Sequence, residues 1–120
     1  MQSTIGGEND TMYQKGDVVL IPFPFTDLTT IKTRPAVIVS VEEFEVETGD
    51  ITVAMITSIP HATPYDYKLK DWQAANLLSP SWVRVKLVAL DPKLVRFNPG
   101  RLSAADLAEV DKRIRLALGL

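Results

Sequence analysis

RPAVIVSVEEFEVETGDITVAMIT, residues 34–57, is the stretch that decides the fold. Two apolar runs of strand length, 36–40 and 51–57, flank an acidic segment that ends at Gly49-Asp50. Short runs rich in Val and Ile predict central strands that are buried on both faces. We interpret the acidic segment as a connection and turn. The stretch therefore predicts two strands of one sheet, with Thr57 at the end of the second.

On the amino-terminal side, DVVLIPFPF over residues 17–25 predicts another strand. Pro22 and Pro24 have no amide N–H to donate, so this strand should end or run along a sheet edge there. Residues 26–33 are then expected to form a polar loop. Residues 1–14 are polar and lack periodicity, and we expect a disordered lead-in there, before one domain over 15–120.

On the carboxyl-terminal side, regular and irregular segments alternate. Residues 59–64 begin and end near prolines and should be irregular, 65–70 alternate like a half-exposed strand, and 71–78 predict about two helical turns. Residues 81–90 predict one or two strands. Alternation places three of their side chains on one face: Trp82, Arg84 and Lys86.

The last element is an amphipathic helix. Its apolar stripe has spacings of three and four and comprises Leu107, Val110, Ile114 and Ala117. Ser103 is a good N-cap, and Gly119 can end the helix. About five short strands and this closing helix predict a small α+β barrel or half-barrel.

Composition narrows the class of protein. The chain has 120 residues, no cysteine and a formal net charge of -2, so a disulfide framework and a thiolate metal site are excluded. We find no apolar stretch of signal-peptide or membrane-span length and expect a cytoplasmic protein with no membrane contact. The charge is unevenly distributed: five acidic residues and no cation lie between residues 40 and 52, whereas cations outnumber acids between 61 and 101. Two ordinary solvated surfaces would give the same pattern.

Common catalytic motifs are absent from the sequence. It has no Gly-rich phosphate loop and no His/Glu pair at metal-ligand spacing, and His61 is its one histidine. We therefore expect no metal and no cofactor.

Three motifs in order resemble the MazF/PemK toxin family: GDVV at 16–19, RPAVIVS at 34–40 and AMITS at 54–58. The later strands and terminal helix are similar too, so the resemblance covers 15–120. The loop TDLTTIK makes the sequence more similar to the PemK-like branch of the family. The resemblance implies a small SH3-like β-barrel (CcdB/MazF-like) with a C-terminal helix, usually a homodimer. The implied activity is metal-independent, sequence-specific cleavage of single-stranded RNA, with a cognate antitoxin as inhibitor and DNA contacted only through the antitoxin complex.

The resemblance places the catalytic arginine at Arg34 and the catalytic threonine at Thr57. An arginine is always charged and binds phosphate oxygens as a planar fork, so we assign Arg34 to charge stabilisation rather than to base catalysis. Thr57 can donate to a phosphate oxygen or orient the ribose 2′-hydroxyl. A surface arginine at a strand start and a threonine that satisfies its own backbone are the structural alternatives.

The remaining candidates are expected to bind RNA rather than to react with it: Lys32, Ser58, Arg84 and Lys86. Trp82 or Tyr65 can offer a stacking surface, although tryptophan in a small barrel is usually buried. His61 can serve as an acid or base, or it can simply be exposed.

Two rival functions fit the same barrel. One is a non-catalytic toxin, like the CcdB toxins that bind DNA gyrase and would not need Arg34 with Thr57. The other is a degenerate member that only binds RNA or antitoxin. A strand between Ser81 and Asp91 that is one residue shorter than the usual family pattern would favour it.

Overall fold

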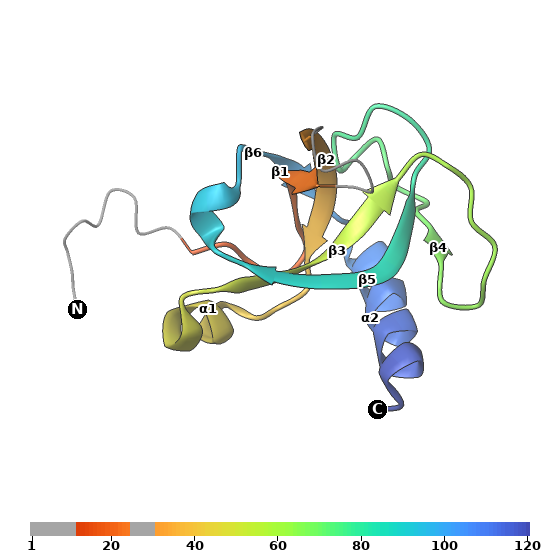
Figure 1. Ribbon diagram of the computed structural model, residues 1–120. Coiled ribbons are helices and arrows are strands. Elements are labelled where there is room, and N and C mark those ends of the chain that lie inside the picture. Colours follow the sequence, from red (N-terminus) through yellow and green to blue (C-terminus); the bar gives the residue numbers. More distant parts are fainter. Residues whose placement is uncertain (1–11, 25–30) are drawn as a thin grey trace.

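The computed structural model describes residues 12–24 and 31–120 as a six-stranded antiparallel sheet that curls into a half-barrel, with helix α2 against one face (Figure 1). The strands are β1 (Asp17–Pro24), β2 (Ile31–Ile38), β3 (Ile51–Thr57), β4 (Tyr67–Lys68), β5 (Trp82–Leu90) and β6 (Phe97–Arg101). The helices are α1 (Glu42–Thr48), the 3-10 turn η2 (Pro92–Leu94) and α2 (Ala104–Leu118). The strand order is β4-β5-β3-β2-β1-β6. This architecture confirms the predicted α+β class.

Two core clusters lie on the two faces of the sheet, because successive side chains of a strand point to opposite sides. The helix face, which we define as the face covered by α2, carries Val18, Val37, Ala54, Ile56 and Val83, packed with Val110 of α2. The opposite face carries Val19, Ile21, Ala36, Ile38, Ile51 and Val53. Each buried Val or Ile side chain contributes roughly 1.5–3 kcal/mol relative to an exposed one, so both clusters hold the strands in register.

The elements with the strongest patterns form as predicted. β3 spans Ile51–Thr57, the predicted run, and Thr57 is its last residue. In α2 the Ser103 side chain accepts a hydrogen bond from the Asp106 amide, and Gly119 ends the helix in the left-handed conformation with φ 74°. Val110 is buried, whereas Ala117 at the end of the predicted stripe is exposed.

Strand β1 shows how the sheet accommodates proline. Its pairing with β6 stops at Leu20, whereas its pairing with β2 continues through Pro22 and Pro24. The prolines therefore lie where β1 is an edge, as predicted. The predicted loop at 26–33 is too long, because Ile31–Thr33 belong to β2; residues 25–30 lie outside the described part.

The acidic segment is wrongly predicted as a connection and turn: it forms helix α1. No residue of α1 is buried, so the helix has no apolar stripe that could have revealed it. Local bonds hold it instead. Thr48 Oγ1 donates to the Phe44 carbonyl at 2.7 Å, and Gly49 ends the helix with φ 79°. Most of the predicted lead-in lies outside the described residues, but the Tyr13 amide donates to Glu45 Oε1 of α1 at 3.0 Å.

Three further expectations need correction. Residues 71–77 form successive turns rather than a regular helix, and Asn76 adopts φ 61°. Only Tyr67–Lys68 pair as a strand, although burial alternates over 67–70 as predicted. Strand β6 is missing from the prediction, because FNPGR has little strand propensity and forms its strand by pairing with β1. None of the described helices is long and apolar enough to cross a membrane.

A buried carboxylate joins α2 to strand β4. Asp106 is 0% exposed, and its oxygens accept hydrogen bonds from the Tyr67 hydroxyl at 2.6 Å, the Lys70 amide at 3.1 Å and the Asp71 amide at 2.9 Å. Burial, and then the hydrogen bond to Asp106, raises the pKa of Tyr67. This clamp fixes β4 beside β5.

Candidate active site

Arg34 and Thr57 lie on two neighbouring strands and line the same cleft. In the β2–β3 ladder Ala36 pairs with Met55, so the same register, extended by two residues, places Arg34 opposite Thr57. Directly opposed residues of an antiparallel pair project from the same face. That face is the one opposite α2, because Ala36 belongs to its core cluster. The sheet therefore brings together two residues that lie 23 positions apart in the sequence.

The Thr57 hydroxyl is oriented by a local hydrogen bond. The Ile59 amide donates to Thr57 Oγ1 at 3.1 Å. This is the backbone bond expected if Thr57 were only a strand-end residue. Because the oxygen acts as the acceptor in this bond, the hydroxyl proton remains available to a group in front of the sheet.

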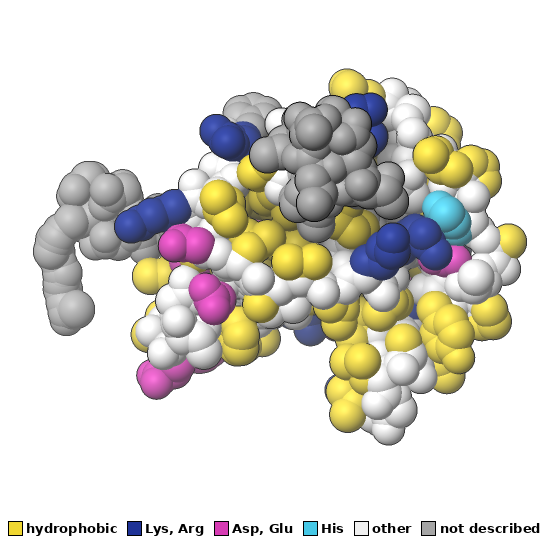
Figure 2. Space-filling model, in the orientation of Figure 1, with side chains coloured by type: hydrophobic (Ala, Val, Ile, Leu, Met, Phe, Trp, Pro, Cys, Tyr) yellow, Lys and Arg dark blue, Asp and Glu magenta, His cyan; other side chains and the backbone are white. Residues whose placement is uncertain are grey.

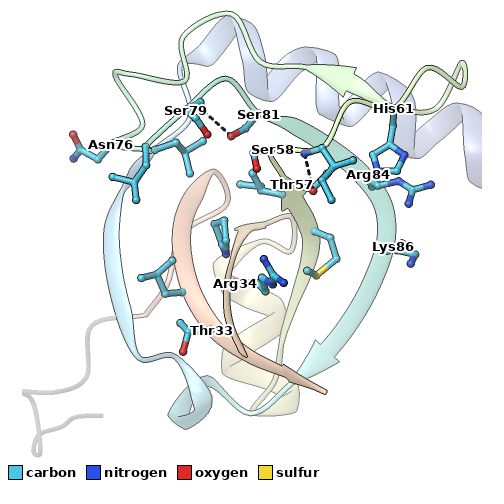
Figure 3. Close-up of a pocket in the computed structure, with 17 residues that line it drawn as sticks. Thr33, Arg34, Thr57, Ser58, His61, Asn76, Ser79, Ser81, Arg84 and Lys86 are labelled. Atoms are coloured by element: carbon cyan, nitrogen blue, oxygen red, sulfur yellow. Dashed lines mark hydrogen bonds between the residues drawn. The ribbon is translucent and has the colours of Figure 1, made fainter. Parts of the chain in front are cut away.

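A cleft of about 720 Å³ opens where β2 begins and β3 ends. Arg34 lies at its centre, with Thr57 and Ser58 above it in Figure 3. Apolar side chains complete the wall, and two of them are strongly exposed: Ile59 at 65% and Leu78 at 100%. A cleft with mixed apolar and cationic walls can hold a ligand that combines flat bases with phosphates.

Strand β5 supplies a cationic flank to this cleft. Arg84 and Lys86 both line it, on the side away from β2, and His61 lies above them in Figure 3. The β3–β5 register shifts between Met55, opposite Arg84, and Ala54, opposite Leu87, so Lys86 stands in an irregularity of the ladder. Figure 2 shows Lys and Arg side chains gathered beside the histidine on this surface.

Lys32 is exposed on β2, two residues before Arg34, but it is not among the residues that line the cleft. Its role as an RNA contact stays a prediction.

Trp82 belongs to the face opposite α2 and lies outside the core. It pairs with Thr57 on one side and with Lys68 on the other, and it is half-buried and absent from both core clusters. The Lys68 Nζ lies 5.3 Å from the centre of its ring. One row of this face thus runs Arg34, Thr57, Trp82, Lys68.

Asp66 is a site residue that the sequence does not reveal. Its Oδ1 accepts from Arg84 Nε at 3.1 Å, and its side chain is only 3% exposed. Burial raises the pKa of Asp66, but the hydrogen bonds from Thr63 and the bond and charge of Arg84 outweigh burial and lower it overall. The carboxylate is therefore held in its charged form beside the cleft.

Metal ligands do not cluster in the described ranges 12–24 and 31–120. No group of three His, Cys, Asp or Glu side chains there could hold a metal ion.

Comparison with known proteins identifies the family. The family described as PemK-like, MazF-like toxin of type II toxin-antitoxin system matches residues 14–118. The comparison with curated proteins by sequence found no match.

Solved structures share the fold at low identity. An endoribonuclease bound to its cognate antitoxin, from a mycobacterial species, superposes with a TM-score of 0.75 at 17% identity, covering 90% of this chain and 96% of that one. MazF from Deinococcus radiodurans gives a TM-score of 0.73 at 24% identity, with 92% and 100% covered. The Mycobacterium tuberculosis toxin MazF-mt6 gives 0.71 at 19% identity, with 87% and 97% covered. With nearly its whole length matched by the family, the chain belongs to the PemK-like, MazF-like toxins of type II toxin-antitoxin systems.

Proposed function

We propose that this toxin is a metal-independent endoribonuclease that cuts single-stranded RNA at short sequences. The observation that carries the proposal is that Arg34 and Thr57 line one cleft, which also has a cationic flank. Family membership supports it, and so do the fold neighbours that are themselves endoribonucleases.

The reaction requires no group beyond RNA and protein. The ribose 2′-oxygen attacks the adjacent phosphorus, the bond from phosphorus to O5′ breaks, and a 2′,3′-cyclic phosphate and a 5′-hydroxyl result. The 2′-hydroxyl proton passes to a base, and O5′ takes up a proton from an acid. The protein must orient the 2′-hydroxyl and stabilise the extra negative charge on the phosphorane.

Arg34 suits the charge-stabilising role, because its guanidinium is permanently charged and can donate two parallel hydrogen bonds to phosphate oxygens. Thr57 can donate its hydroxyl proton to a phosphate oxygen or to the 2′-oxygen, since its own oxygen is oriented by the Ile59 amide. Ser58 lies next to it in the same cleft. His61 also lines the cleft and is the residue to test as the proton carrier.

Binding of the RNA backbone is assigned to Lys32, Arg84 and Lys86. The net charge of -2 does not oppose this assignment, because cations gather at the cleft while five acidic residues lie in or beside α1. Attraction of RNA depends on the local field more than on the total charge.

Two partners are part of the proposal. The first is a cognate antitoxin, because similar structures contain an antitoxin or MazE bound to the toxin. The second is another copy of the chain, giving a homodimer. DNA would be contacted only through the antitoxin complex.

The test is cleavage of a long single-stranded RNA in excess EDTA, with every fragment end mapped. The wild type should cut at a short recurrent sequence and leave a 2′,3′-cyclic phosphate. Arg34→Ala and Thr57→Val should lower the rate at least about 100-fold, as loss of a charge-stabilising donor does elsewhere. Thr57→Ser, which keeps the hydroxyl, should recover most of the activity.

Lys112→Ala on α2 is the matched control for loss of a cation and should cut like the wild type. Intact RNA from folded wild-type protein would reject the ribonuclease and favour a binding toxin on the same barrel.

A further inference from the structure

The buried carboxylate of Asp66 forms an ion pair with Arg84. The register that pairs Lys68 with Trp82, extended by two residues, sets Asp66 opposite Arg84. Asp66 Oδ1 accepts from Arg84 Nε at 3.1 Å, and Oδ2 accepts from Thr63 Oγ1 at 2.6 Å and from the Thr63 amide at 3.1 Å. The Asp66 side chain is 3% exposed, whereas that of Arg84 is 30% exposed.

This contact orients the guanidinium. Arg84 uses Nε for Asp66, so this bond leaves unused the outer edge of the guanidinium, which has one N–H from each Nη nitrogen. Arg84 also lines the cleft that contains Arg34. A free arginine side chain loses rotamer entropy when a ligand immobilises it. Asp66 orders the side chain before any ligand arrives.

An acidic residue at position 66 is unfavourable for the attraction of RNA to this surface. A carboxylate beside the cationic flank weakens the attraction between this surface and any polyanion. Its burial is also costly unless hydrogen bonds compensate for it. A gain in the geometry of Arg84 explains why an acidic residue occupies this position.

The same carboxylate also fixes a turn. The Asp66 amide donates to the Thr63 carbonyl at 3.1 Å, which together with the two bonds from Thr63 closes residues 63–66 into a compact unit. This unit ends the irregular segment that carries Ser58 and His61 along the cleft. A test must therefore separate the orientation of Arg84 from the stability of the turn.

We propose that Asp66 is a positioning residue that preorganises the Arg84 guanidinium as a fork for a second RNA phosphate, apart from the one held by Arg34. This inference rests on the proposed ribonuclease function. It assigns substrate binding, not the chemical step, to the pair.

The experiment compares wild type, Asp66→Asn, Arg84→Ala, the double variant and Thr63→Val. Steady-state cleavage of a long single-stranded RNA in EDTA gives KM and kcat. Binding of a random-sequence 2′-O-methyl RNA pool, which lacks the nucleophile, gives Kd. Asp66→Asn and Arg84→Ala should each raise KM and Kd about 5- to 10-fold while kcat changes less than about twofold, and the double variant should be no weaker than Arg84→Ala alone.

The sign of the Asp66→Asn effect is decisive. If only electrostatic attraction matters, removal of the negative charge of Asp66 should tighten RNA binding. If the orientation of the Arg84 guanidinium matters, the same variant should weaken RNA binding. Unchanged or tighter binding by Asp66→Asn would overturn the proposal, and so would additive effects in the double variant.

Thr63→Val keeps the Arg84 contact but loses two bonds of the turn, the one that Thr63 Oγ1 donates to Asp66 and the one that it accepts from the Tyr65 amide. Its Kd should stay near that of the wild type. A rise equal to that of Asp66→Asn would assign the effect to the turn and overturn the proposal. If Asp66→Asn does not fold, Arg84→Lys replaces it, because lysine keeps the charge without the fork; wild-type binding by that variant would also overturn the proposal.

The same experiment distinguishes failure of the proposed ribonuclease function from failure of this inference. Wild-type protein that neither binds the 2′-O-methyl pool nor cuts RNA would reject the ribonuclease together with this inference. Wild-type protein that cuts RNA, with variants that bind it equally well, would reject the inference alone.

Discussion

Replacement of Tyr67 by Phe should lower the free energy of unfolding by about 2 kcal/mol, the usual contribution of a hydrogen bond to a charged group. The Tyr67 hydroxyl donates to Asp106 at 2.6 Å, and Asp106 is fully buried. The variant leaves that carboxylate with two backbone donors, from Lys70 and Asp71. The ring itself stays, with its packing and the Arg113 guanidinium 5.3 Å from its centre.

Urea unfolding followed by circular dichroism measures this loss. The midpoint should fall with an unchanged slope, because the surface exposed on unfolding is the same. Tyr65→Phe is the matched control: Tyr65 is 43% exposed, so its variant should change stability by less than about 0.5 kcal/mol. Equal effects of the two variants would refute the idea that the Asp106 clamp stabilises the fold.

Three further predictions concern the close packing of strand β6, acid stability and RNA binding. A Cβ at Gly100 would lie 2.5 Å from the Ala75 carbonyl oxygen, so Gly100→Ala should cost about 1–3 kcal/mol in the same assay. Burial raises the pKa of the Asp66 carboxyl, but the hydrogen bonds that it accepts lower this pKa overall. The ionised carboxylate therefore stabilises the fold at pH values above the pKa of Asp66 in the unfolded chain. This stabilisation is lost as the pH falls through the lower pKa of the folded protein. Asp66→Asn should thus be less stable than wild type near neutral pH, and this gap should shrink below about pH 4; a constant gap would contradict it. Lys86→Ala should reduce the salt dependence of RNA binding by about 0.7 in log–log slope, whereas Lys112→Ala should leave it unchanged.

Local patterns predicted the elements whose burial is regular. Strand β3 is apolar along its whole length, and α2 combines a buried stripe with Ser103 and Gly119 at its ends. Helix α1 buries nothing, and β6 contains Pro99 and Gly100, so their own sequences gave little indication of either. Tertiary pairing decides the conformation of β6, as it often does for strands.

In the candidate site, too, sequence motifs revealed some residues, whereas others depend on how the strands pair. Arg34 and Thr57 were found through motifs, but their facing arrangement depends on the β2–β3 register, which no local pattern specifies. Asp66 could not be found, because it meets Arg84 only through a ladder of two residue pairs between β4 and β5. Strand alternation predicted that Trp82 shares a face with Arg84, whereas its residue type favoured the core; Trp82 lies on the face opposite α2 and outside both core clusters.

The most direct test of the central claim uses an RNA oligonucleotide that carries one mapped cleavage site. A single 2′-deoxyribose replaces the ribose whose 2′-hydroxyl is the proposed nucleophile, and cleavage is followed in EDTA under single-turnover conditions. If the 2′-oxygen attacks the phosphate positioned by Arg34 and Thr57, the substituted strand should bind with a Kd within about threefold of the all-ribose strand and remain uncut. Cleavage of the substituted strand at the same bond would contradict the proposed mechanism.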